Sequence, residues 1–450
     1  MKKKFYIAIV SLLCVAVVGV IGFGIYKYKN SEKPKEPEKP NVIKPGEYGD
    51  TDFSVRLIKT TNSTQTSNYL ISPYSIEIAL KMVKDGANGE TYNQVNNLIG
   101  ERDIPTFMAK ERINVANGAF ITNKYKPAFE SSYYEKLKKY NADLIFDEYN
   151  TPNPINEWVS KQTYGMIPKL MDEISPYFAF GLANAVAIDV EWDVAFKCED
   201  TREQDFTKED NSKIKVEMMH DSYENYGKYF KTDDATGVIL DYRKYDKDGK
   251  QVFDEDEEGN YIEQEGTRLE FVGILPNESV SDYVNSLTSD KIKEIDNKTQ
   301  LIKDMKNTVL SVHLPRFSYE FELTPFAKIL NDMGMKDAFD KGKADFTNIV
   351  SRDTMQKMGV ENIYIDTAIH KTYIDLNEKG TKAAAVTYFG FAEATSAVDD
   401  RPEPTVIEVK FDKPFIYMIR DSKTKEILFF GVVREPNVWK GKTCRDAEEE

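Results

Sequence analysis

Hydrophobic and polar positions alternate with a period of two in the segment that follows Gly380. One face of an extended chain here carries no charge, and its residues are Thr381, Ala383, Ala385, Thr387, Phe389 and Phe391. The opposite face carries Lys382, Ala384, Val386, Tyr388 and Gly390. The segment from Gly380 to Arg401 contains no proline, so the pattern predicts a strand able to lie in the middle of a sheet. The next residues, DDRPEP, are typical of an exposed loop, so the segment is expected to be loop in one state and strand in another.

A second apolar pattern lies near the N-terminus, where three lysines precede an uncharged, largely apolar run from Phe5 to Tyr26. As a helix this run spans roughly 33 Å, enough to cross the hydrocarbon core of a membrane. It has no A-x-A-like exit, which a cleaved secretion signal needs. Residues 1–29 are therefore predicted to be an uncleaved membrane anchor, with a cleaved signal segment as the alternative. The short N-terminal side favours a single-pass anchor in the cell membrane with the bulk of the chain extracellular; otherwise the protein is secreted.

The rest of the chain divides by composition. Residues 30–48 are rich in Pro, Lys and Glu, which predicts a stiff, extended linker. Residues 49–438 are predicted to form the globular part, because 41% of the chain is hydrophobic and a sizeable core can form. Residues 439–450 are predicted to be an acidic C-terminal tail.

Charge and motif content exclude several function classes. The formal net charge of -15 argues against a nucleic-acid partner. The chain lacks G-x-S-x-G, H-E-x-x-H and the glycine-rich nucleotide-binding motifs. His220, His313 and His370 are isolated from one another in the sequence, so each is interpreted as a structural group. The three cysteines are too few and too scattered for a disulfide framework. The sequence therefore predicts neither an enzyme nor a cofactor.

One segment follows the spacing of a calcium-binding loop. DEDEEGNYIEQE places Asp254, Asp256, Glu258 and Glu265 at the positions where such a loop has ligands. Glu258 is bulkier than the usual residue, and the flanking segments GVILDYRKY and LEFVGILP predict strands where that site requires helices. The segment is therefore interpreted as an acidic, solvated hairpin, and no metal is predicted.

A set of longer motifs, taken in order, resembles the serpin family from about Asp52 to Pro436. The motifs are NYLISPYSIEIALKMVKDGANGET, VANGAF, INEWVSKQTYGMIPKL, LANAVAIDVEWDVAF, VHLPRFSYEFEL, LNDMGMKDAFDKGKADFTNI, IHKTYIDLNEKGTKAAAVT and FDKPFIYMIRDSKTKEILFFGVVREP. No single motif is decisive, but the ordered set is highly specific. The chain resembles a bacterial-type, membrane-tethered member of this family.

The resemblance implies an α+β fold with three β-sheets, a cluster of about eight or nine helices and an exposed reactive loop. In that family a target serine protease cuts the loop and is trapped as a covalent acyl-enzyme when the cut loop inserts into the main sheet. The implied function is suicide-substrate inhibition by a monomer whose partner is the target protease. No sulfated-polysaccharide activator is expected, because residues 100–117 are too short for an additional helix and have no dense basic face. The alternative is a non-inhibitory, serpin-like binding or structural protein at the cell surface.

By the same resemblance, the opening segment is the hinge of the reactive loop. The hinge residues are Glu378, Gly380, Thr381, Ala383, Ala384, Ala385 and Thr387. The residues expected where the sheet parts are Ser72, Ser75, Asn184, Trp192, Arg316 and His370. Glu378 is expected to pair with Arg316 and to hold the end of the loop until insertion. Gly380 supplies the backbone freedom that a hinge needs.

The family spacing also indicates the bond that the protease cuts. Counting 17 residues from Glu378 places the reactive bond between Ala394 and Thr395. Ala394 suits the small specificity pocket of an elastase-like or subtilisin-like serine protease. Because the chain beyond Ala394 is longer than the family norm, the alternatives stay open and are Phe391, Glu393 and Ala397.

Overall fold

The computed structural model describes residues 52–224, 226–254, 262–381 and 403–436. The predicted anchor, linker and acidic tail fall outside these residues, and so does the reactive loop beyond Thr381. The fold described below belongs to the compact unit within residues 43–450. Within the described part of the chain, no helix combines the length and the apolar character that a membrane crossing requires.

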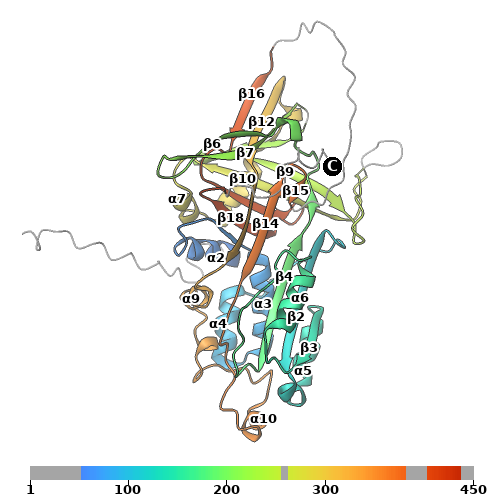
Figure 1. The fold of residues 1–450 in the computed structure, drawn as a ribbon, viewed down its shortest axis with the longest axis vertical. Coiled ribbons are helices and arrows are strands. Elements are labelled where there is room, and N and C mark those ends of the chain that lie inside the picture. The colour runs from blue at the N-terminus through green and yellow to red at the C-terminus, as the bar shows by residue number, and fades with distance from the viewer. Residues whose placement is uncertain (1–51, 225, 255–261, 382–402, 437–450) are drawn as a thin grey trace, which may run out of the picture. The chain divides into compact units, whose positions relative to one another are not determined.

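A seven-stranded antiparallel sheet forms the centre of the fold (Figure 1). Its strand order is β1 (Tyr69–Ile71), β18 (Ile427–Val433), β17 (Phe415–Asp421), β10 (Thr267–Pro276), β9 (Ala235–Tyr245), β8 (Lys228–Lys231) and β11 (Thr299–Leu301). Both faces of this sheet are buried. Ile416 and Met418 contribute to one hydrophobic core, while Tyr417 and Ile419 contribute to another. Side chains alternate across a strand, so a sheet between two cores needs apolar residues at successive positions, as FIYMI has.

A four-stranded sheet carries the chain that returns from the reactive loop. Its strand order is β16 (Thr405–Lys410), β12 (Thr308–Pro315), β7 (Lys213–Tyr223) and β6 (Arg202–Thr207). The β16–β12 pair is parallel, and the other pairs are antiparallel. The described chain therefore resumes at the far side of the loop as an edge strand of this sheet.

Two smaller sheets carry the hinge. One has the order β13 (Phe317–Glu322), β14 (Lys371–Asn377), β15 (Gly380–Thr381) and β5 (Val190–Glu191). The other has the order β3 (Ala142–Asp147), β2 (Ile113–Thr122) and β4 (Phe180–Ile188). Only Asp189 separates β4 from β5, so the two sheets are the halves of one larger sheet that is parted along β4 and β14. This parting is why the described residues form four hydrogen-bonded sheets where the sequence predicts three.

Nine α-helices lie within the described residues. They are α2 (Phe53–Asn62), α3 (Pro73–Gly86), α4 (Gly89–Ile99), α5 (Ser131–Lys138), α6 (Asn153–Gln162), α7 (Val280–Asn285), α8 (Ser289–Lys298), α9 (Phe326–Asp332) and α10 (Arg352–Lys357). The buried helix α3 begins at Pro73, because the Ser72 side chain caps it and proline is favoured at the first helical position. The mixed α+β architecture expected from the sequence is confirmed.

Close packing of β9 against β10 generates a stability prediction. A methyl group at Gly237 would lie 2.0 Å from the backbone oxygen of Gly273, which cannot rotate away. We expect Gly237→Ala to lower the free energy of unfolding by about 2–4 kcal/mol, measured by urea denaturation. Gly342→Ala is the matched control, because its nearest neighbour would be a side-chain oxygen of Asp340 at 3.4 Å. Equal effects of the two substitutions would contradict the packing described for β9 and β10.

Candidate functional site

The first two residues of the predicted inserting segment already lie in a sheet. Gly380 and Thr381 form β15, which pairs with β14 on one side and with β5 on the other. The neighbours of Thr381 in these ladders are Leu376 and Val190. The chain thus enters the parted sheet at the end where β15 lies between β14 and β5.

Gly380 is required by the close approach of this short strand to β5. Its φ is +154°, and a Cβ atom here would lie 2.1 Å from the backbone oxygen of Val190. A side chain would therefore force β15 away from β5. The sequence predicted the role of Gly380 from hinge flexibility, while the structure adds a steric reason.

The side chain of Thr381 is 2% exposed and forms a hydrogen bond with a tyrosine of the central sheet. Its Oγ1 lies 2.6 Å from the hydroxyl oxygen of Tyr242 on β9. The Tyr242 ring stacks on Trp192 with ring centroids 4.4 Å apart and an interplanar angle of 9°. Trp192 Nε1 in turn donates to the backbone oxygen of Asn377 at 2.9 Å. Tyr242 was not predicted, because a tyrosine in a buried strand gives no signal in the sequence that its hydroxyl faces the hinge.

Glu378 lies buried beside the hinge, where its contacts include an ion pair and two hydrogen bonds. Its Oε2 is 3.4 Å from Nε of Arg316, and the side chains of the pair are 3% and 5% exposed. Thr201 donates its hydroxyl to Glu378 Oε1 at 2.7 Å, and the backbone N–H of Phe196 donates to the Glu378 carbonyl at 3.0 Å. The ion pair between Arg316 and Glu378 that the sequence predicts is therefore present, and it is buried rather than exposed. Removing one partner of a buried pair is costly, so these contacts hold the chain in place just before the hinge.

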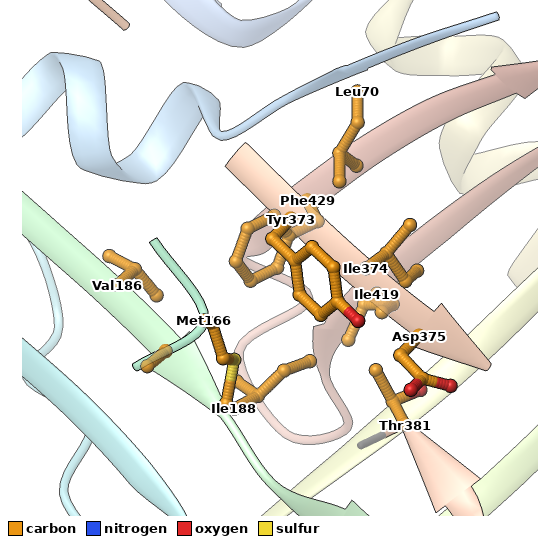
Figure 2. Close-up of a pocket in the computed structure, with 11 residues that line it drawn as sticks. Leu70, Met166, Val186, Ile188, Tyr373, Ile374, Asp375, Thr381, Ile419 and Phe429 are labelled. Atoms are coloured by element: carbon orange, nitrogen blue, oxygen red, sulfur yellow. The ribbon is translucent and has the colours of Figure 1, made fainter. Parts of the chain in front are cut away.

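A narrow pocket lies between β4 and β14, and Thr381 is one of the residues that line it (Figure 2). Its sides are formed by Val186, Ala187 and Ile188 of β4 and by Tyr373, Ile374 and Asp375 of β14. Figure 2 shows Val186 and Ile188 on one side and Tyr373 and Ile374 on the other. The free space of about 10 Å³ accommodates about one water molecule. The seam between β4 and β14 is therefore narrow here and would have to widen before a strand could enter.

The strand edges along this seam have ladder positions left over. One edge of β14 pairs with β13 along its length. On its other edge, within the described residues, only Leu376 and Asn377 pair with a strand, which is β15. Within the described residues, β4 pairs with β2 and has no strand on its other edge. Unpaired edges of this kind template the addition of a strand. The arrangement can accept an extended segment that runs antiparallel to β14, as β15 already does.

Three of the residues predicted to gather beneath the sheet are joined by hydrogen bonds. His370 Nε2 accepts from the backbone N–H of Ser72 at 3.0 Å, and Ser72 Oγ accepts from the backbone N–H of Ser75 at 3.2 Å. Burial lowers the pKa of His370 from its usual value near 6.5 to about 3. The imidazole is therefore neutral at physiological pH and serves as an acceptor, in agreement with the structural reading of this histidine.

Asn184 belongs to a different hydrogen-bonded pair. It lies on β4, and its Nδ2 donates to Oδ1 of Asn117 on β2 at 2.7 Å. Asn117 in turn donates to the backbone oxygen of Tyr140 at 2.8 Å. Within the described residues, no hydrogen bond links Asn184 to His370. The sequence grouped Asn184 with Ser72 and His370 and missed Asn117, because cross-strand pairing depends on register that only the folded sheet defines.

The calcium-like segment contributes no metal site within the described residues. Asp254 Oδ1 lies 2.7 Å from Lys244 Nζ, and its Oδ2 lies 3.6 Å from a guanidinium nitrogen of Arg268. These cations occupy the carboxylate that would have to bind calcium. Asp256 and Glu258 lie outside the described residues, and the part of the chain that is described contains no cluster of metal-binding side chains that includes Glu265. The flanking strands β9 and β10 are present, as the sequence predicts.

Cys198 forms a disulfide bond, which the sequence did not predict. The remaining predicted residues of the loop lie outside the described part of the chain, and they are Ala383, Ala384, Ala385, Thr387, Ala394 and Thr395. Their roles stay predictions.

Comparison with protein families gives one match over most of the chain. A family model described as serpin (serine protease inhibitor) matches residues 48–436. The leukocyte elastase inhibitor of Xenopus tropicalis is 27% identical over 415 residues, which cover 86% of this chain and 98% of the relative.

Solved structures of similar fold agree with this match. The thermophilic serpin tengpin in its native state is 29% identical, with a TM-score of 0.67 over 86% of this chain and 93% of tengpin. Thyroxine-binding globulin in complex with thyroxine has a TM-score of 0.65 over 86% of this chain and 96% or more of its own. At 21% identity, this second likeness shows the fold alone.

The buried His370 generates a prediction on pH dependence. Its folded-state pKa of about 3 is below its usual value of 6.5, so the unfolded chain binds the extra proton first. The stabilising contribution is complete above about pH 6.5, is lost as the pH falls, and levels off below about pH 3. This one group should lower the free energy of unfolding by about 3 kcal/mol between pH 7 and pH 4.

His370→Gln keeps an acceptor but does not titrate, so its unfolding free energy should fall by about 3 kcal/mol less over this pH range. Urea denaturation at pH 7 and pH 4 measures the difference, and His220→Gln serves as the control substitution. Parallel losses of stability in the wild type and His370→Gln would show that His370 is not the buried neutral group described here.

Proposed function

The chain belongs to the serpin family, and we propose that it inhibits serine proteases as a suicide substrate. One observation carries this proposal: the hinge strand β15 enters a sheet that is parted along β4 and β14. The segment that follows Thr381 has an uncharged face, so it can occupy the seam without burying charge. The name of the leukocyte elastase inhibitor from Xenopus tropicalis supports the same activity.

In the proposed mechanism, the target protease supplies all of the catalytic chemistry. Its serine attacks the carbonyl carbon of the reactive bond, the leaving amine of Thr395 departs, and Ala394 remains esterified to the protease. The freed segment then inserts from Thr381 onward as a strand between β14 and β4. Because the protease is covalently attached to the far end of that strand, insertion carries it along the sheet before water can hydrolyse the ester.

The residues around the hinge have mechanical roles in this proposal. The buried pair of Arg316 and Glu378 anchors the chain immediately before β15, so movement is confined to the residues that follow. Gly380 lets the chain pass close to β5. Insertion then starts from a fixed position in the sheet. This should make insertion faster relative to deacylation of the trapped protease.

The target class and the location are finer proposals. Ala394 at the cut bond favours an elastase-like or subtilisin-like protease, since such enzymes accept a small side chain there.

We further propose that residues 1–29 tether the inhibitor to a membrane with the globular part outside the cell, based on the apolar run from Phe5 to Tyr26. The protein itself is proposed to have no catalytic activity and no cofactor.

Trapping requires Thr381 to stay inside the sheet. Thr381→Arg places a long cation at a site that is 2% exposed, so insertion should fail while the loop sequence beyond it is unchanged. We expect an elastase-like protease to cut this variant and to be released active. SDS-stable complexes that form with the wild type should fall at least tenfold. Thr381→Ser, which keeps the hydroxyl, is the matched control and should trap the protease.

Undiminished complex formation by Thr381→Arg would contradict loop insertion. The position of the reactive bond is checked separately with Ala394→Arg, which should redirect trapping toward trypsin-like proteases. If specificity does not change, the cut lies elsewhere between Phe391 and Val398.

Cutting the loop should stabilise the protein, because the new strand adds ladder hydrogen bonds along β4 and β14. It also buries Phe389 and Phe391, and each aromatic side chain contributes roughly 1.5–3 kcal/mol when fully buried. We expect the melting temperature, measured by calorimetry, to rise by at least about 4 °C after a single cut, since each kcal/mol of stabilisation raises the melting temperature of a domain of this size by roughly 1 °C. A melting temperature that stays constant after a clean single cut would support the non-inhibitory alternative.

A further inference from the structure

The hydroxyl of Tyr242 contacts the hinge from a sheet that takes no part in insertion. Tyr242 lies on β9 of the central seven-stranded sheet, and its side chain is fully buried. Its hydroxyl oxygen is 2.6 Å from Thr381 Oγ1, and Thr381 is also buried. Within the described residues, neither hydroxyl has another hydrogen-bond partner. Burying a hydroxyl without a hydrogen-bond partner is unfavourable. The hydroxyls of Tyr242 and Thr381 therefore both stabilise the conformation in which they contact each other.

Tyr242 is held in place independently of Thr381. Its ring stacks on Trp192, and the backbones of the two residues form a β-bridge. The backbone N–H of Trp192 donates to the oxygen of Lys379, and its indole N–H donates to the oxygen of Asn377, both at 2.9 Å. Burial raises the pKa of Tyr242, so its hydroxyl stays protonated and able to donate. The stacking on Trp192 and the β-bridge do not involve Thr381, so they hold Tyr242 in place when the Thr381 side chain moves.

We infer that Tyr242 is a positioning residue for loop insertion, whose hydroxyl holds Thr381 in the sheet before the loop is cut. The expected effect on inhibition rests on the proposed function, whereas the contact between Tyr242 and Thr381 does not depend on it. With Thr381 in place, the inserting strand starts from two residues that are already paired with β14 and β5. Without the hydrogen bond, the hinge leaves the sheet more often, and insertion begins later relative to deacylation.

Two isosteric substitutions remove the contact from either side. Tyr242→Phe keeps the ring and its stacking on Trp192, and Thr381→Val keeps the shape of the hinge side chain. Each substitution should lower the equilibrium constant for holding the hinge in the sheet by about five- to tenfold, the usual scale for one buried neutral hydrogen bond. The double variant should be no worse than the stronger single variant, because both substitutions delete the same interaction.

The matched control is Tyr417→Phe. Tyr417 is also a fully buried tyrosine of the central sheet, and its hydroxyl is 2.9 Å from the hydroxyl of Tyr319 rather than from the hinge. Its substitution deletes the same chemical group from the same core. Any effect shared by Tyr242→Phe and Tyr417→Phe therefore reports general destabilisation.

Two measurements test the inference on the full chain. Hydrogen exchange followed at the amide of Thr381 should be about five- to tenfold faster in Tyr242→Phe and Thr381→Val, and close to wild type in Tyr417→Phe. The number of inhibitor molecules consumed per trapped protease should rise about three- to tenfold in the first two variants only, at an unchanged rate of loop cleavage.

Exchange at Thr381 that is the same in Tyr242→Phe, Thr381→Val and wild type would overturn the inference, and so would fully additive effects in the double variant. If the wild type traps no protease at all, the proposed function fails, but exchange at Thr381 still decides whether Tyr242 holds the hinge. Should Tyr242→Phe fail to fold, Thr381→Val alone supplies both measurements.

Discussion

The structure depends on one constraint: the backbone groups along the facing edges of β4 and β14 need hydrogen-bond partners. Backbone N–H and C=O groups in a sheet require partners, and along this seam the described strands do not supply them to each other. Among the described strands, β15 links β14 to β5, the strand that follows β4 in the chain, through Gly380 and Thr381. The division of the sheet and the entry point of the hinge both correspond to this unfilled strand position.

Buried polar contacts occur at both ends of the seam. Near the hinge these are the ion pair of Arg316 with Glu378 and the hydrogen bond of Tyr242 with Thr381. Beneath the sheet, His370 accepts from the backbone of Ser72. Such groups are tolerated in a core only when they are paired, so each contact favours one definite arrangement of the strands. The parted sheet is therefore held by a few specific contacts, while the hydrophobic cores on either side of the central sheet stabilise the rest of the domain.

Local patterns were sufficient for much of the fold. The strands β9 and β10 were predicted from their own apolar residues alone. The ordered motifs placed Arg316 and Glu378 at one site, and the structure brings their side chains together. Contacts across strands could not be predicted in the same way. Asn117 and Tyr242 reach their partners through strand register, which the spacing of residues in the sequence does not reveal.

By itself, the sequence determined which segments are apolar, where Gly380 interrupts them, and that the face beginning at Thr381 carries no charge. These are properties of single residues and their neighbours, and they do not depend on the rest of the chain. Only the tertiary structure decided that the main sheet is parted between β4 and β14 and that Thr381 already lies within it. The physical reason is that hydrogen bonding and burial at the hinge are shared among β5, β9 and β14, strands that are far apart in sequence and meet only when the chain has folded.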